Sequence, residues 1–232
     1  MILKKLILIG LLMTTCVLAN AQTISNMQIH YDMGSYKVND REITRNQMRG
    51  KFQMLGFDSL GSYYWGADLI YSPEEDKATS GQLTIFRGFK FSKKTHLQLV
   101  AGHTGIVGLN NFYYAGIHHP LKFGKVIILP MLLYSYNKSA KGPDVLFTTA
   151  FNTRILNDKV TIFGFFNAFT TDKVLPDGTI NGKRTVMQLS PNIMYNLTKQ
   201  IAIGTEIEAA YHRYSPEDKV IVLPGAMMRW TF

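Results

Sequence analysis

The sequence predicts an all-β protein, a transmembrane antiparallel up-and-down β-barrel of about twelve strands. Three observations support this prediction. The chain begins with a secretory-type segment, then divides into alternating stretches, and ends on a strand with one wholly apolar face. After residue 21 the longest apolar stretch is residues 126–133, which is too short for a membrane-spanning helix of about 20 residues but suits a strand. Only helices and closed barrels satisfy every backbone group in lipid, so a chain without such helices crosses a membrane as a barrel.

Residues 1–21 have the organisation of a secretory signal peptide. Lys4 and Lys5 form a basic start, residues 6–13 form an apolar run, and residues 19–21 form a small-x-small cleavage site. We therefore expect cleavage after Ala21 and a single barrel domain over residues 22–232. The only cysteine, Cys16, leaves with the signal, so the mature chain has no disulfide framework and depends on hydrogen bonding and burial.

The basic charge of the chain does not point to a nucleic-acid partner. The net charge of +9 falls to +7 once residues 1–21 are removed, because that segment holds Lys4 and Lys5 and no acidic residue. Lysine and arginine are spread between strands and turns and form no basic run or basic helix. We assign the excess charge to the barrel lumen and the loops.

Alternation with a period of two residues defines the strands in order. The first two segments, residues 27–36 and 45–57, each have one apolar and one polar side, the pattern of a barrel with lipid outside and water within. Ten more segments are predicted at residues 62–71, 81–91, 97–104, 112–121, 126–136, 145–156, 160–170, 185–197, 201–212 and 220–232. The separators hold the Gly, Asn, Lys and Pro expected of turns, and an even strand number is typical of single-chain bacterial barrels.

Tyrosine and tryptophan gather near the ends of these segments, where rings at headgroup level would form two aromatic girdles. The candidates are Tyr63, Tyr64, Trp65, Tyr71, Tyr113, Tyr114, Tyr134, Tyr136, Tyr211, Tyr214 and Trp230. Aromatic residues are also common in strands of any kind, so the girdles are a hypothesis at this stage.

The last strand carries an apolar face that ends in Met228, Trp230 and Phe232. A chain that ends in this way resembles the transmembrane barrels of bacterial outer membranes, whose terminal Phe-capped strand is read by the barrel-assembly machinery. The resemblance implies that Met228, Trp230 and Phe232 are the assembly signal of a monomeric barrel surrounded by outer-membrane lipid. The alternative is an ordinary sandwich strand that happens to end the chain.

Three stretches together resemble a family of outer-membrane barrel proteins of Bacteroidetes-type bacteria. They are IHYDMG at residues 29–34, GTEIE at residues 204–208 and LPGAMMRWTF at residues 223–232. That family is in turn remotely similar to the Tsx-type nucleoside-specific channel-forming porins, which are twelve-stranded barrels with narrow lumens. The resemblance covers the mature chain and implies a channel, with nucleosides as the solute by analogy. No Tsx motif matches residue by residue, so no nucleoside-contact residue is carried over.

Closing the barrel places the last strand beside the first, so polar faces of four neighbouring strands meet on one lumen wall. They contribute His30, Asp32, Arg49, Lys51, Glu206, Glu208 and Arg229. Alternating acids and bases can pair with one another and also offer hydrogen bonds to a polar solute in a narrow pore. The alternative is a structural network that plugs or stiffens the barrel.

These features predict an outer-membrane channel for passive uptake of small polar solutes. A structural or adhesive barrel without transport, and a lipid-processing outer-membrane enzyme, remain as alternatives. An enzyme is not the expectation, because the sequence holds no HExxH, GxSxG or Gly-rich phosphate loop. His118 and His119 are neighbours in a predicted strand and therefore point to opposite faces. No cofactor or metal is expected.

Overall fold

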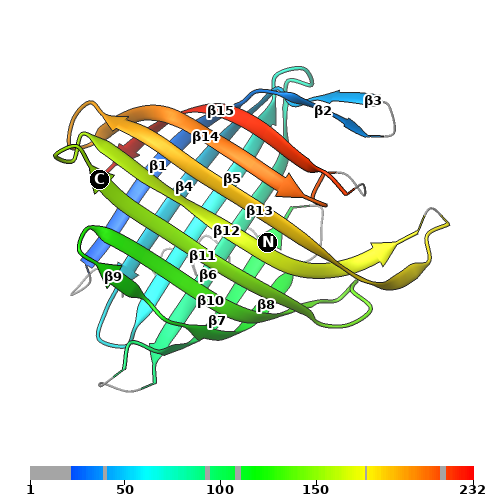
Figure 1. Ribbon diagram of the computed structural model, residues 1–232, viewed down its shortest axis with the longest axis horizontal. Helices are drawn as coiled ribbons and strands as arrows, with labels where there is room; N and C mark the ends of the chain where they lie inside the picture. The colour runs from blue at the N-terminus through cyan, green and yellow to red at the C-terminus, as the bar shows by residue number, and fades with distance from the viewer. Residues whose placement is uncertain (1–21, 39–40, 92–94, 108–110, 176, 215–217) are drawn as a thin grey trace, which may run out of the picture.

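The computed structural model describes residues 22–38, 41–91, 95–107, 111–175, 177–214 and 218–232. The predicted signal peptide, residues 1–21, lies outside the described residues. Twelve antiparallel strands form a closed barrel (Figure 1). In chain order they are β1 (Gln22–Asp32), β4 (Gln47–Phe57), β5 (Ser62–Ser72), β6 (Lys77–Lys90), β7 (Gln98–Ile106), β8 (Phe112–His118), β10 (Val126–Asn137), β11 (Asp144–Ile155), β12 (Val160–Val174), β13 (Ile180–Asn196), β14 (Ile201–Tyr211) and β15 (Val220–Thr231). The described part of the chain contains no helix with the length and apolar character needed to cross a membrane.

The barrel closes where its last strand meets its first. Trp230 of β15 lies opposite Met27 of β1, and the Phe232 N–H donates to the Ser25 carbonyl at 3.0 Å. Because each barrel strand has a neighbour on both sides, the backbone hydrogen bonds run around the whole circumference and leave no open edge. The prediction of an all-β, closed antiparallel barrel of twelve strands is confirmed.

One barrel strand is interrupted near a proline. The segment predicted at residues 112–121 divides into β8 and a short β9 (Leu121–Phe123), and both pair with β10. Pro120 has no N–H to give to the ladder, which explains the break. The register continues across it, because the His119 N–H still donates to the Pro130 carbonyl of β10 at 3.1 Å.

A small hairpin separates from the barrel between β1 and β4. We expected the first strand to reach residue 36, but β1 ends at Asp32, and β2 (Ser35–Val38) pairs with β3 (Arg41–Thr44) in a separate sheet. Gly34 adopts a φ of +139° at the point of departure, a conformation that favours glycine. We call this end of the barrel the hairpin end and the opposite end, where β1 begins and Phe232 lies, the terminal end (Figure 1).

The barrel is taller at the hairpin end than the sequence predicted. β12 and β13 extend beyond the expected limits of residues 170 and 185, and their pairing reaches Val174 and Ile180. Lys183 stabilises this extension, because its Nζ lies 3.0 Å from Asp144 and 2.6 Å from Asp172. Figure 1 shows the two strands projecting past their neighbours.

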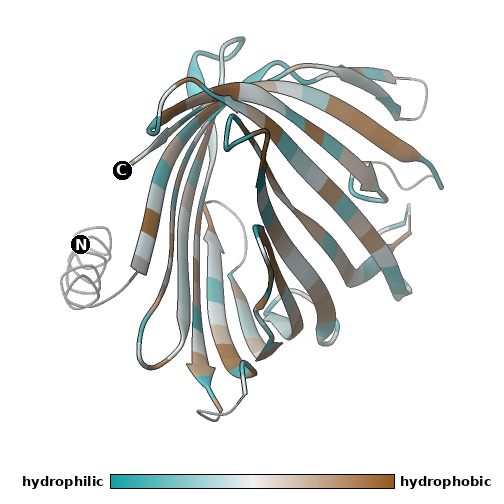
Figure 2. Cartoon of the chain, turned by 60° about the vertical axis from the view of Figure 1, so that its left-hand side comes forward, coloured by the Kyte–Doolittle hydropathy of each residue, from teal (hydrophilic) through white to brown (hydrophobic). Residues whose placement is uncertain are grey.

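The strands alternate between an outer apolar face and an inner face. In β15, Met228 and Trp230 are each 46% exposed on the outside, whereas Leu223 and Met227 are buried inside. Hydrophobic and hydrophilic bands follow one another along the strands in Figure 2. This arrangement suits a lipid environment, in which the exposed outer face would contact acyl chains.

Part of the aromatic set predicted to form the girdles lies inside the barrel. Tyr113 and Trp230 are exposed on the outer face, but Tyr64 and Tyr114 line the interior of the barrel. The pair Tyr113 and Tyr114 gives the physical reason, because neighbours in a strand point to opposite faces and only one of them can meet lipid. Tyr214 likewise turns to an interior carboxylate instead of the membrane.

Candidate functional site

A cavity of about 1850 Å³ occupies the interior of the barrel. Its lining includes Lys122, Asp158 and Thr231 at the terminal end of the barrel. The same cavity is also lined by Ser80 and Asp144 at the hairpin end. The interior is therefore hollow along the barrel axis, which makes this lumen the candidate functional site.

A charged network covers one wall of the lumen, where β14, β15, β1 and β4 are neighbours. Arg49 of β4 contacts Asp32 of β1, with an Nη2–Oδ1 distance of 3.2 Å, and also forms an ion pair with Glu206 of β14. Gly225 of β15 lies opposite both Asp32 and Glu206. Because this glycine has no side chain, groups on strands to either side of β15 can meet across it.

Arg45 is the main member of the charged network that the sequence did not single out. Its guanidinium lies 3.1 Å from Oδ2 of Asp32 and 3.0 Å from Oε2 of Glu208, and stands 5.3 Å from the centre of the Tyr214 ring. Arg45 is in phase with Arg49 but precedes the first residue of β4. It nevertheless lies within the predicted segment 45–57, so the polar face of that segment already includes it, although β4 itself begins at Gln47.

Glu208 is held by several donors at once. The Tyr214 hydroxyl and the Gln188 amide each donate to its Oε1 at 2.6 Å. Burial raises the pKa of the Tyr214 phenol, and the charge of Glu208 reinforces the shift. Burial opposes the charge of Arg45, but the nearby carboxylates of Glu208 and Asp32 favour it, and the pKa of Arg45 is raised. This arrangement keeps Arg45 charged and Tyr214 protonated at neutral pH.

The seven residues predicted from sequence divide into a buried and a cavity-facing group. His30, Asp32 and Glu206 are 1%, 6% and 3% exposed and are absent from the cavity lining. The lining does include Arg49, Lys51, Glu208 and Arg229. The structure thus brings His30, Asp32, Arg49, Glu206 and Glu208 into one network, with Lys51 and Arg229 beside it.

Lys51 and Arg229 are two cationic residues that lie beside the charged network and line the cavity. Among the described residues, no carboxylate lies within ion-pairing distance, 4.0 Å, of either side chain. The Arg229 guanidinium stands 4.9 Å from the centre of the Phe163 ring. These two cations are therefore available to act on ions or solutes in the lumen.

The lumen as a whole carries more basic than acidic side chains. The described lining residues include eight basic ones, Arg45, Arg49, Lys51, Lys122, Lys125, Arg154, Arg213 and Arg229, against the four acidic ones Asp68, Asp144, Asp158 and Glu208. Asp32 and Glu206 lie just behind this surface and reduce the excess. The remaining positive charge gives the lumen a field that favours anions.

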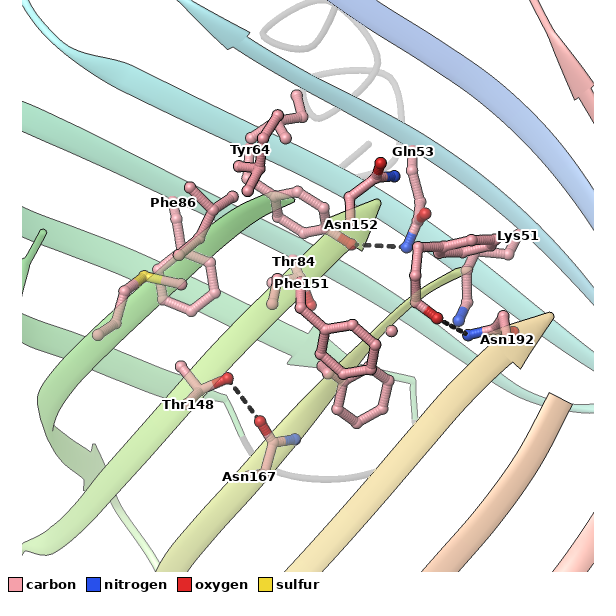
Figure 3. A pocket seen from close by; sticks show the side chains of 18 of the residues that line it. Lys51, Gln53, Tyr64, Thr84, Phe86, Thr148, Phe151, Asn152, Asn167 and Asn192 are labelled. Atoms are coloured by element: carbon pink, nitrogen blue, oxygen red, sulfur yellow. Dashed lines mark hydrogen bonds between the residues drawn. The ribbon is translucent and has the colours of Figure 1, made fainter. Parts of the chain in front are cut away.

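Away from the charged network the lining is neutral and rich in amides and hydroxyls (Figure 3). Gln53 donates to the Tyr64 hydroxyl at 3.1 Å, and Thr148 donates to Oδ1 of Asn167 at 2.5 Å. Asn192 donates to the Phe163 carbonyl at 3.2 Å. The sequence did not indicate these residues, because inward amides alternate with apolar residues in many strands and have no motif.

The histidine pair behaves as neighbours in a β-ladder. His118 is buried, with its Nδ1 3.0 Å from the Pro130 carbonyl, whereas His119 is exposed. Within the described ranges, no group of three His, Cys, Asp or Glu residues is placed to hold a metal ion. The groups that the lumen lining offers are charged side chains, amides, hydroxyls and aromatic rings.

Comparison with known proteins places this fold among outer-membrane porins. Residues 24–232 match the family described as "Domain of unknown function (DUF5020)". The KdgM porin solved in complex with disordered oligogalacturonate aligns with a TM-score of 0.53 and 8% identity, over 89% of this chain and 99% of that chain. The NanC porin aligns with a TM-score of 0.58 and 8% identity, over 90% and 98%. No curated protein matches the sequence. The similarity to the two porins is one of fold.

Proposed function

The chain belongs to the DUF5020 family, and from that premise we propose that this member is an outer-membrane channel for passive passage of small polar solutes. The observation that carries the proposal is the cavity whose lining includes residues of both barrel ends. A polar interior inside an apolar exterior supports it further, because water and polar solutes can occupy such a lumen while lipid surrounds the barrel.

The location follows from the same proposal. Residues 1–21 serve as a signal peptide that is cleaved after Ala21, and the barrel-assembly machinery inserts the mature chain into the outer membrane as a monomer. Phe232 supports this reading, because its ring lies beside Trp230, with centroids 5.1 Å apart, on the exposed apolar edge of the closing strand. Expression with the native signal tests the claim, and the mature protein should begin at Gln22 and fractionate with outer membranes.

Nucleosides are the first solutes that we propose for this channel, because the sequence resembles the Tsx-type porins. Amides and hydroxyls on several strands support uncharged solutes, since they can donate to and accept from ring nitrogens and sugar hydroxyls. Liposome swelling compares solutes directly. Faster swelling with nucleosides than with sugars of similar size would support nucleoside preference, and equal rates would leave a general pore.

Planar-bilayer recording tests the channel itself. Refolded protein comprising residues 22–232 should produce discrete conductance steps, and the same preparation unfolded by heat should not. A folded barrel without conductance above background would mean that the charged network acts as a plug. The protein would then be a structural or adhesive barrel.

A further inference from the structure

Three aromatic side chains form a row on the lumen wall. This part of the wall is apolar, unlike the part that carries the charged network. The ring centres of Tyr64 on β5 and Phe86 on β6 are 6.5 Å apart, and those of Phe86 and Tyr114 on β8 are 5.3 Å apart. Tyr64 lies opposite Phe86 in the ladder, and Gly102 of β7 lies opposite both Phe86 and Tyr114. All three aromatic residues line the cavity. We call this row the aromatic shelf.

Glycines beneath the shelf let two of its rings lie against the wall. A Cβ at Gly102 would stand 2.2 Å from Cδ1 of Phe86, and a Cβ at Gly66 would stand 2.5 Å from the Tyr64 hydroxyl. Real side chains do not tolerate such distances, so these rings occupy the space that other residues would take. The rings therefore cover the barrel wall without filling the lumen, and the cavity stays open in front of them.

Polar groups border the aromatic shelf. The hydroxyls of Thr84 and Thr104 lie 3.1 Å apart, and the Gln82 amide donates to Thr84 at 3.0 Å. The Gln53 amide reaches the Tyr64 hydroxyl at the other end of the shelf. Neighbouring rings of the shelf are tilted by 42° to each other and form an apolar surface with hydroxyls and amides along its edge. Asp68, a charged residue that also lines the cavity, lies opposite Gln82 in the ladder.

We propose that the aromatic shelf is a stacking subsite for neutral solutes that have a ring with an apolar face and a hydrogen-bonding edge. Nucleosides and pyranose sugars share this chemistry, whereas linear polyols and simple ions do not. The flat face of the solute would stack on the shelf, and its polar edge would reach the neighbouring hydroxyls and amides. The inference rests on the proposed channel function and adds to it the class of solute that the lumen retains.

Single-channel current tests the subsite, because a stacked solute blocks ion flow for as long as it stays bound. Adenosine, maltose and linear sorbitol are added at equal concentration to the open wild-type channel. Adenosine or maltose should produce blocking events, and sorbitol should produce none. Blocking by adenosine alone would support the subsite with a base as the stacked ring, and blocking by maltose would support it with a sugar ring.

Three variants, Tyr64→Leu, Phe86→Leu and Tyr114→Leu, remove the aromatic faces. Each should shorten the blocking events by about tenfold, the loss expected from one stacking contact, while the channel still opens. Tyr113→Leu is the matched control, since Tyr113 adjoins Tyr114 but is 51% exposed on the outer face. Phe86→Tyr keeps an aromatic face and should keep the block.

The outcomes separate the subsite from the channel. Equal blocking by sorbitol, or unchanged blocking times in Phe86→Leu, would overturn the aromatic shelf as a subsite and leave the channel in place. Absence of conductance in the wild type would refute the channel, and the shelf inference with it. If a leucine variant fails to fold, titration calorimetry of adenosine and maltose against the folded wild-type and Phe86→Tyr barrels in detergent still decides. If neither adenosine nor maltose produces a heat of binding, the inference is overturned.

Discussion

Nδ1 of His30 lies 2.8 Å from Oε2 of Glu206, although the two residues are on β1 and β14, with β15 between them. The other ring nitrogen, Nε2, lies 2.9 Å from Oε1 of Gln28, so both nitrogens face oxygen acceptors. Arg49 adds a cationic partner to Glu206. Glu206 of β14 is thus a buried carboxylate that is held by side chains of β1 and β4.

Glu206→Gln should destabilise the folded barrel. The change removes one of the two carboxylates that pair with Arg49 and leaves Asp32, 3.2 Å away, as the remaining one. The loss should therefore be smaller than the roughly 3–5 kcal/mol of a buried pair broken outright. Thermal unfolding in detergent, followed by the heat-dependent gel shift, measures the effect. Glu75→Gln is the control, because the Glu75–Lys77 pair has side chains 55% and 65% exposed and should contribute about 0–1 kcal/mol. Equal stability of the two variants would show that the charged network does not stabilise the barrel.

Lys51→Gln combined with Arg229→Gln should shift ion selectivity toward cations. Both residues line the cavity, so their removal takes two positive charges from the field that a permeating ion experiences. The reversal potential across a salt gradient measures the shift. Lys77→Gln, which also removes a positive charge but lies outside the cavity lining, should leave the reversal potential unchanged. A double variant with wild-type selectivity would mean that ions do not pass this wall.

Much of the fold was predictable because period-two alternation reports directly on which face meets lipid. The apolar face of the last strand, Met228 and Trp230 included, is on the outside as expected, and β14, β15, β1 and β4 are neighbours. Strand ends were less predictable. Gly34 and Pro120 end or interrupt strands through backbone geometry, which the alternation of side chains does not record.

The site was only partly predictable, because the sequence does not reveal which polar groups meet. Arg45 joins Asp32 to Glu208 from a position just before β4. The predicted segment 45–57 includes it in the polar phase, but the sequence does not show which carboxylates it meets. Tyr64 and Tyr114 resemble membrane-facing aromatics in composition, and only the phase of their strands places them in the lumen. Distances across the barrel depend on closure and register together, which local sequence does not set.

Deletion of Phe232 should reduce assembly of the barrel more than its stability once folded. Phe232 is 60% exposed and its ring lies beside Trp230, with centroids 5.1 Å apart, where it completes the apolar face of the closing strand. The amount of heat-shifting folded protein in outer membranes should fall strongly. Phe123→Ala, which removes another ring that is 62% exposed, should leave that amount unchanged. Normal levels of folded barrel in the deletion would remove the role of Phe232 as an assembly signal.

Gly102→Ala should lower the conductance of the channel. The new methyl group would meet the Phe86 ring at 2.2 Å, so the ring must leave the wall and turn into the lumen. Gly50→Ala is the matched control, because no heavy atom lies within 4 Å of a Cβ at that position. Single-channel recording compares the two, and equal conductance would mean that Phe86 does not border the conducting path.

The most direct measurement of the central claim is access to one lumen position from both sides of a bilayer. Residues 22–232 contain no cysteine, so Asn152→Cys places a single thiol at a position that lines the cavity. A charged, water-soluble thiol reagent should reduce the conductance when added to either compartment, and Leu69→Cys, which is 54% exposed on the outer face, should not respond. Reaction of Asn152→Cys from one compartment alone, or from neither, would contradict an open channel.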